Sequence, residues 1–228
     1  MELQKEILHG RLHGRWYDDA CGTAFALEVV GERWALLVLR ELMFGPLRFS
    51  DLKAALPGIS AKVLTERLAG LEQAGVVARA VLPPPARGTQ VYELTPWGLM
   101  AEPMIQEMGR WAARSPIHDP RLPLSPVSLM LSLRTMLDRK AAKGKSADVG
   151  FAVAGQEFRA RLEDRKLPIT REPVAGAQIV VRAPDAALVA ATIYAGVPAS
   201  DLPGLVIEGD TKQWQRFAAL FSLPPKVG

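Results

Sequence analysis

The segment from Pro57 to Val77, PGISAKVLTERLAGLEQAGVV, most constrains what this chain can fold into. Its apolar residues are spaced three, four and three apart, which predicts a helix over residues 60–74 with one face against a core. Ser60 is suited to cap the start of this helix, and Gly75 is suited to end it. The apolar stripe consists of Ala61, Leu64, Leu68 and Leu71.

A second short helix is predicted directly upstream, over residues 50–56. Ser50 would cap it, and Leu52 and Leu56 would face inward. The Pro57–Gly58 pair marks a tight turn between the two helices. Two short helices joined in this way form a helix-turn-helix, whose second helix offers its outward side chains to a DNA groove. A small helical hairpin with one solvent-facing side fits the same pattern.

The flanking sequence favours the helix-turn-helix. Helices are predicted over residues 20–31 and from Trp34 onward, the latter apolar nearly all round and ended by Gly45–Pro46. After Gly75, the runs VVARAVL and QVYELT have strand character and are joined by the loop PPPARGT. Three helices followed by a hairpin form a winged helix, in which a basic residue at the wing tip can reach phosphates or the minor groove.

A further helix is predicted from Thr95, its cap, to about Arg114. Pro96 stands at its first position, and Pro103 inside it predicts a kink or two pieces. This helix, together with the first twenty residues, carries more apolar surface than a small winged helix needs. We therefore expect it to pair with a second subunit, since two-fold homodimers match palindromic operators.

The charge distribution restricts where nucleic acid could bind. The net charge is +4, but residues 1–115 carry thirteen Lys plus Arg and thirteen Asp plus Glu. Between Arg48 and Gln90, six basic residues stand against three acidic ones. Any DNA-binding surface must therefore be local, and this stretch is its best position.

The run from Cys21 to Val77, followed by YELTPWG, resembles the HxlR-type winged helix-turn-helix transcriptional regulators over about residues 16–114. The resemblance rests on Cys21 and on the motifs at residues 31–34, 39–42, 49–52 and 56–60. It implies a bacterial, dimeric, DNA-binding protein that represses or activates nearby genes. By position, it implies groove contacts from Ser60, Lys62, Thr65 and Arg67, backbone contacts from Arg48 and Ser50, and wing contacts from Arg87, Thr89 and Gln90. The PPPA run at residues 83–86 departs from the family pattern and stiffens the wing loop.

Cys21 has two interpretations. In some proteins that this chain resembles, a cysteine at this place senses oxidants or electrophiles, and a thiolate near a helix N-terminus is activated for that chemistry. The alternative is a small apolar residue buried at the start of a helix.

The second half of the chain reads as a separate domain. The run SPIHDPRLPLSP has four prolines in twelve residues, so residues 115–125 are predicted to be a linker between domains at 1–114 and 126–228. In EFRARLED, apolar and charged residues alternate, which indicates a sheet with one buried face. Further strands, and helices such as the one opened by Asp210, complete the second domain. The fold class of the whole chain is therefore predicted as α+β.

This order of elements, and the run VIEGDTKQWQRFAALF, resembles the sterol carrier protein domain over about residues 126–223. The resemblance implies an apolar or lipid-like ligand held between sheet and helices. The candidate lining residues are Leu129, Met130, Leu133, Phe151, Ile193, Trp214 and Phe217. Each of them is explained equally well as part of a packed core.

Several classes of protein are not expected. The chain has no triad, phosphate loop or paired carboxylates in a recognisable arrangement, so we expect no enzyme and no cofactor. One cysteine and three scattered histidines give no zinc-ligand spacing, so we expect no metal. The sequence shows neither an apolar run long enough for a bilayer nor a signal peptide, which predicts a cytoplasmic protein with no membrane partner.

The sequence therefore predicts a ligand-responsive transcriptional repressor that binds a double-stranded DNA operator as a homodimer and an apolar small molecule through its second domain. Two alternatives stay open. One is a lipid or small-molecule carrier whose winged helix only dimerises, and the other is a redox or electrophile sensor based on Cys21.

Overall fold

The computed structural model describes residues 17–82 and 88–228. The chain divides into two compact units, Met1–Glu102 and Pro103–Gly228. Both units contain helices and strands, as an α+β chain requires. Among the described residues, no helix is both long enough and apolar enough to cross a bilayer.

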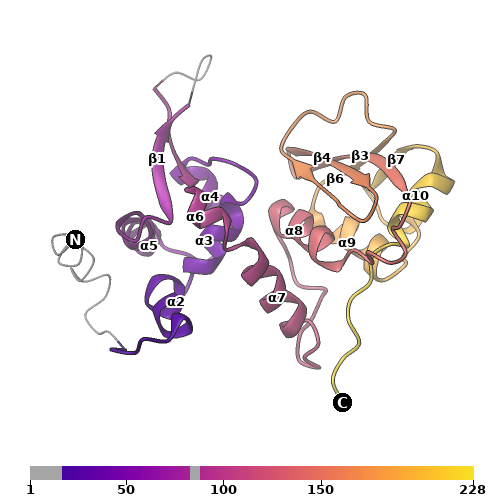
Figure 1. The fold of residues 1–228 in the computed structure, drawn as a ribbon. Helices are drawn as coiled ribbons and strands as arrows, with labels where there is room; N and C mark the ends of the chain where they lie inside the picture. Colours follow the sequence, from indigo (N-terminus) through magenta and orange to yellow (C-terminus); the bar gives the residue numbers. More distant parts are fainter. Residues whose placement is uncertain (1–16, 83–87) are drawn as a thin grey trace. The chain divides into compact units, whose positions relative to one another are not determined.

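The N-terminal unit is a winged helix (Figure 1). Strands β1 and β2 pair in antiparallel fashion, with Val77 opposite Leu94 and Val81 opposite Gln90. The helix pair and the hairpin predicted from the sequence are both present. The elements of this unit are α2 (Gly22–Val30), α3 (Ala35–Leu42), α4 (Phe49–Ala55), α5 (Ala61–Gln73), β1 (Val77–Val81), β2 (Gln90–Leu94) and α6 (Pro96–Leu99). The predicted cap of the first helix of the pair is wrong: α4 begins at Phe49 with Arg48 at its N-cap, so Ser50 lies inside the helix.

The core of this unit lies between α3, α4 and α5. Leu39, Leu52 and Leu64 have no exposed surface, and Leu68 and Leu71 are 1% exposed. Ala61, which the spacing placed on the same stripe, is instead exposed. The buried stripe of α5 therefore begins one turn later than the sequence pattern indicates.

The helix predicted over residues 95–114 consists of two pieces, as Pro103 indicated. Thr95 caps α6 by accepting a hydrogen bond from the backbone N–H of Gly98 at 3.1 Å. After a break at Met100 and Ala101, α7 runs from Glu102 to Ala112 and belongs almost entirely to the C-terminal unit.

The C-terminal unit contains a five-stranded sheet in the order β5-β4-β3-β6-β7. The pair β3 and β6 is parallel, and the other three pairs are antiparallel. The two-residue strand β5 was not predicted from the sequence. The elements are α8 (Pro126–Met136), β3 (Ser146–Val153), β4 (Gln156–Glu163), β5 (Ile169–Thr170), β6 (Ile179–Ala183), α9 (Ala186–Tyr194), a 3-10 turn (Ala199–Asp201), β7 (Val206–Gly209) and α10 (Thr211–Ala218).

Both faces of this sheet are covered. On one face, Phe151 pairs with Phe158, and its ring lies 6.4 Å from the ring of Phe217 on α10. On the other face, a Cβ at Gly150 would stand 2.7 Å from Cβ of Val174, so the segment after β5 packs directly on the strand. Residues that alternate along β3 and β4 therefore meet helices on one side and a loop on the other.

Candidate nucleic-acid interface

The turn between α4 and α5 is shaped by Gly58. Its φ of +93° lies in the left-handed region, which a residue with a Cβ adopts at a cost. A Cβ at this position would lie 3.7 Å from Cη2 of Trp34, so the indole ring covers the turn. Ile59, which follows, is 1% exposed and anchors the start of α5 in the core. The motifs at residues 31–34 and 56–60 therefore meet in space.

The N-terminal half of α5 presents polar side chains to solvent. The Ser60 hydroxyl caps the helix by accepting a hydrogen bond from the backbone N–H of Val63 at 3.1 Å. Lys62 is exposed and forms no ion pair among the described residues. Thr65 is also exposed, and its hydroxyl donates to the carbonyl of Ala61 at 2.9 Å, which leaves its oxygen able to accept. These three side chains can meet a DNA groove.

Arg67 has a different position from the other predicted groove residues. Its Nη2 lies 3.0 Å from Oε2 of Glu32, and its Nε donates to the carbonyl of Arg33 at 3.1 Å. Its side chain is only 18% exposed. The guanidinium therefore joins α5 to the connection between α2 and α3, and we assign it to the support of α5.

The predicted backbone contacts lie at the start of α4. Arg48 and Ser50 are both exposed, and the Arg48 backbone N–H donates to Oδ2 of Asp51 at 3.3 Å. The Ser50 hydroxyl lies 3.4 Å from Oδ1 of the same carboxylate. The Asp51 carboxylate therefore occupies this end of the helix, and a contact to the DNA backbone would come from the exposed side chains of Arg48 and Ser50.

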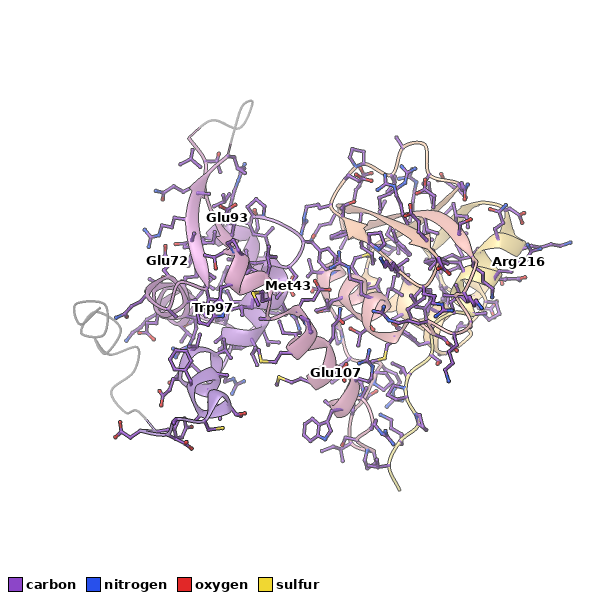
Figure 2. The ribbon with its side chains drawn as sticks, in the orientation of Figure 1. Met43, Glu72, Glu93, Trp97, Glu107 and Arg216 are labelled. Atoms are coloured by element: carbon purple, nitrogen blue, oxygen red, sulfur yellow. The ribbon has the colours of Figure 1, made fainter. Side chains whose placement is uncertain are left out.

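The wing carries the remaining predicted residues. Gln90 is exposed at the start of β2, and Thr89 is half-buried with its carbonyl accepting from Leu82 at 3.1 Å. Arg87 lies outside the described residues. On β1, Arg79 pairs with Glu72 at 2.8 Å, and its guanidinium carbon lies 5.6 Å from the centre of the Tyr92 ring. Figure 2 shows Glu72 beside this strand, where its carboxylate reduces the positive charge of the patch.

Cys21 is an exposed free thiol at the N-cap of α2, so it is not the buried apolar residue of the second interpretation. The backbone N–H groups of Ala24 and Thr23, together with the Thr23 side chain, lower the pKa of the thiol because they stabilise the thiolate. Among the described residues, no group of three or more His, Cys, Asp and Glu side chains is arranged to hold a metal ion.

The residues predicted to line a ligand cavity are packed as core. Leu129, Met130, Leu133 and Phe151 have no exposed surface. Ile193, Trp214 and Phe217 are between 2% and 7% exposed, and the rings of Trp214 and Phe217 lie 6.1 Å apart. Phe217 also borders a hollow between α10 and the start of β3.

Comparison with known proteins agrees with the geometry of the N-terminal unit. The family model described as HxlR-like helix-turn-helix matches residues 29–118. The HTH-type transcriptional regulator YodB of Bacillus subtilis is 42% identical over 88 residues, which cover 38% of this chain and 77% of YodB. YvaP of the same organism, described as an uncharacterized HTH-type transcriptional regulator, is 40% identical over 87 residues, which cover 38% of this chain and 80% of YvaP.

This chain belongs to the HxlR-like helix-turn-helix family. It is therefore a DNA-binding transcriptional regulator, and the exposed face of α5 is its candidate recognition surface. A solved structure of reduced YodB from B. subtilis is 37% identical in sequence and has a TM-score of 0.39. The match covers 44% of this chain and 100% of the YodB chain. The family model ends at residue 118, so the sterol carrier-like assignment of residues 126–228 stays a prediction.

Replacing Lys62 with Ala tests the recognition surface. If the ammonium reads a base edge, we expect operator binding to weaken by about 1–3 kcal/mol, with relaxed specificity at one position. If it contacts a phosphate, binding to all DNA sequences weakens, and the slope of log K against log salt concentration falls in magnitude by about one. Fluorescence anisotropy on operator and scrambled DNA at several salt concentrations separates the two. Lys166→Ala, the same change at an exposed site in the C-terminal unit, is the control. Unchanged binding by Lys62→Ala would exclude this residue from the interface.

Alkylation of Cys21 should have its pH midpoint at a lower pH in the folded protein than in an unstructured peptide. Because its pKa is lowered, the thiolate is populated at a lower pH than in an unstructured peptide. The rate of alkylation by iodoacetamide should therefore reach half its maximum at a lower pH in the protein than in a peptide of the same local sequence. Since this is the chain's single cysteine, the rate is assigned without ambiguity. Thr23→Val should move the midpoint part of the way back, and equal midpoints in protein and peptide would contradict the prediction.

Proposed function

We propose that this protein is a ligand-responsive transcriptional repressor that binds a palindromic operator as a homodimer in the bacterial cytoplasm. The observation that carries the proposal is the exposed N-terminal half of α5, with Lys62 and Thr65 directed away from a fully buried leucine stripe. Helix-turn-helix proteins insert this part of the second helix into the major groove.

Dimerisation is supported by the surface of α7. None of the eleven residues of this helix is buried in the single chain. Trp111 is 78% exposed and Met108 is 46% exposed, and Ile117 beyond the helix is 92% exposed. Large exposed apolar side chains gathered on one segment are typical of an interface. A second copy of α7 is the partner that an operator-binding dimer provides.

Control by a ligand is supported by where α7 belongs in the chain. The helix lies within the range that the family model matches, yet it belongs to the C-terminal unit. Nη2 of Arg110 on α7 donates to the carbonyl of Thr135 on α8 at 2.6 Å. A change in the C-terminal unit can therefore bias the helix expected to join the two subunits.

The tail that follows α10 holds the end of α7. The ammonium of Lys226 donates to the carbonyls of Ala113, Ser115 and His118 at distances between 2.9 and 3.0 Å. The backbone N–H of Val227 donates to the carbonyl of Arg114 at 2.8 Å. All three carbonyls belong to residues after Ala112, the last residue of α7, so the tail is bonded to the segment through which the chain leaves this helix. We define this set of contacts as the tail clasp and propose that it transmits a ligand-induced shift of α10 to α7.

A redox or electrophile sensor is a second candidate function. It is favoured by the exposure of Cys21 and by the lowered pKa of its thiol. Both functions use the same DNA-binding surface, so they differ only in the signal that changes operator affinity.

The regulator function predicts specific binding to DNA from immediately upstream of the protein's own gene. At physiological salt we expect saturable binding with a Kd of about 10 nM or tighter that survives excess nonspecific DNA. Anisotropy titrations at two salt concentrations measure it. Binding lost to competitor at every promoter fragment tried would favour the carrier alternative. A loss of affinity on treatment with diamide that is absent in Cys21→Ser would favour the sensor.

Replacing Trp111 with Glu tests the dimer. A buried carboxylate at the interface is unfavourable, so we expect the variant to sediment as a monomer at concentrations where the parent protein is a dimer. Operator affinity should fall roughly a hundredfold because the two half-sites are then bound independently. Val206→Glu, at a residue that is 50% exposed on β7, is the matched control. A Trp111→Glu protein that remains dimeric would exclude α7 as the interface.

A further inference from the structure

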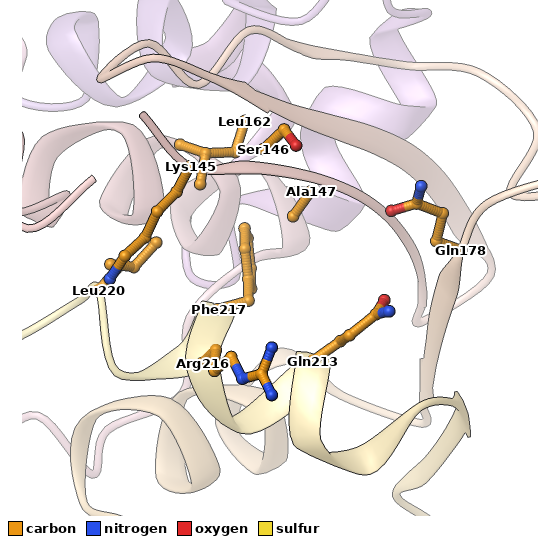
Figure 3. Close-up of a pocket in the computed structure, with 9 residues that line it drawn as sticks. All are labelled: Lys145, Ser146, Ala147, Leu162, Gln178, Gln213, Arg216, Phe217 and Leu220. Atoms are coloured by element: carbon orange, nitrogen blue, oxygen red, sulfur yellow. The ribbon is translucent and has the colours of Figure 1, made fainter. Parts of the chain in front are cut away.

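The hollow between α10 and the start of β3 has a cavity volume of about 450 Å³ (Figure 3). This volume is within the range of small-molecule sites, which is about 300–1,000 Å³. Four segments line it: the start of β3 with the residue before it, the end of β4, the residue before β6, and α10 with the turn after it. Its lining residues are Lys145, Ser146, Ala147, Leu162, Gln178, Gln213, Arg216, Phe217 and Leu220.

The floor of this pocket is apolar. Ala147 and Leu162 are paired across β3 and β4, and Phe217 and Leu220 come from the buried face of α10 and the turn after it. Figure 3 shows Phe217 rising from α10 toward Ala147, with Lys145 on one side and Gln213 on the other. Because Ala147, toward which Phe217 is directed, has a small side chain, space is left above the floor that a larger side chain would fill.

The rim of the pocket is polar and cationic. Lys145 and Arg216 form no ion pair with any described residue. The side-chain amides of Gln178 and Gln213 likewise have no hydrogen-bond partner within the described part of the chain. Two cations and two amides with unused donors therefore surround one apolar floor.

Acidic residues also lie near this rim. The pKa of Asp138 is lowered first by the backbone N–H groups of Ala141 and Lys140 and then by the positive charges of Lys140 and Lys145, so this carboxylate offsets part of the charge of Lys145. Asp148 on β3 is paired with Arg159 on the opposite face of the sheet, which the segment after β5 covers. The carboxylate of Asp164 accepts a hydrogen bond from the backbone N–H of Gly144 at 3.0 Å. Glu163 is exposed at the end of β4, opposite Ser146. Arg216 lines the pocket and is exposed on α10 (Figure 2).

We infer that this pocket binds an organic carboxylate with a compact apolar body. Lys145 and Arg216 bind the carboxylate by charge-assisted hydrogen bonds, the amides of Gln178 and Gln213 orient it, and the body rests on Phe217 and Leu220. This inference rests on the proposed function, which it deepens by naming the ligand class and by moving the site from the packed core to the edge of α10. The same helix leads into the tail clasp.

The test uses calorimetry on the full chain without DNA. The probes are two carboxylates of different shape, 1-naphthoate and decanoate, each compared with its neutral amide. We expect at least one carboxylate to bind with one site per chain and its amide to bind at least tenfold more weakly. The double variant Lys145→Gln/Arg216→Gln should lose at least tenfold in carboxylate affinity and leave amide binding unchanged. Arg139→Gln/Lys166→Gln removes the same charge from exposed positions outside the pocket and should behave as the parent protein does.

Three outcomes would overturn the inference: no binding of either carboxylate, equal affinity for acid and amide, or equal losses in the two double variants. The proposed function is measured separately, by operator anisotropy with and without the bound carboxylate. A carboxylate that binds through Lys145 and Arg216 but leaves operator affinity unchanged supports the pocket and refutes control of DNA binding by this ligand.

Discussion

The burial of Leu64, Leu68 and Leu71 decides what the N-terminal unit can offer to DNA. Side chains on a helix recur every 3.6 residues, so turning these three into the core turns Lys62 and Thr65 outward. The left-handed Gly58 and the indole ring of Trp34 then set the direction in which α5 leaves the turn. The packing of the buried leucines therefore determines which side chains of α5 form the recognition surface.

Features with local causes could be predicted from the sequence. The caps at Ser60, Thr95 and Asp210 depend on a side chain and an N–H two or three residues away, so the sequence pattern identifies them directly. The role of Arg67 could not be predicted in this way, because its partners Glu32 and Arg33 lie some 35 residues earlier in the chain. Strand β5 was missed because two residues are too few to show a period.

The candidate ligand site shows a second limit of sequence reasoning. An apolar residue on an amphipathic helix has the same spacing whether it fills a core or lines a cavity, so Leu129 and Phe217 could not be told apart. What distinguishes the pocket is its polar rim, which comes from Lys145, Gln178 and Arg216. Residues far apart in the sequence meet there only after the sheet forms. The available signal was a basic run that ends where a strand begins, at Lys145.

The position of α7 limits how a ligand could act on DNA. A ligand shifts an equilibrium only by its difference in affinity for two states, and coupling between sites is typically about 1–3 kcal/mol. Displacing α7 by a large motion would require far more than this. Making or breaking a few contacts at its end, such as those from Lys226 to three carbonyls, is on the right scale. Because α10 borders the pocket and the tail clasp follows it in the chain, the proposed signal from Arg216 and Phe217 to α7 would not require either unit to unfold.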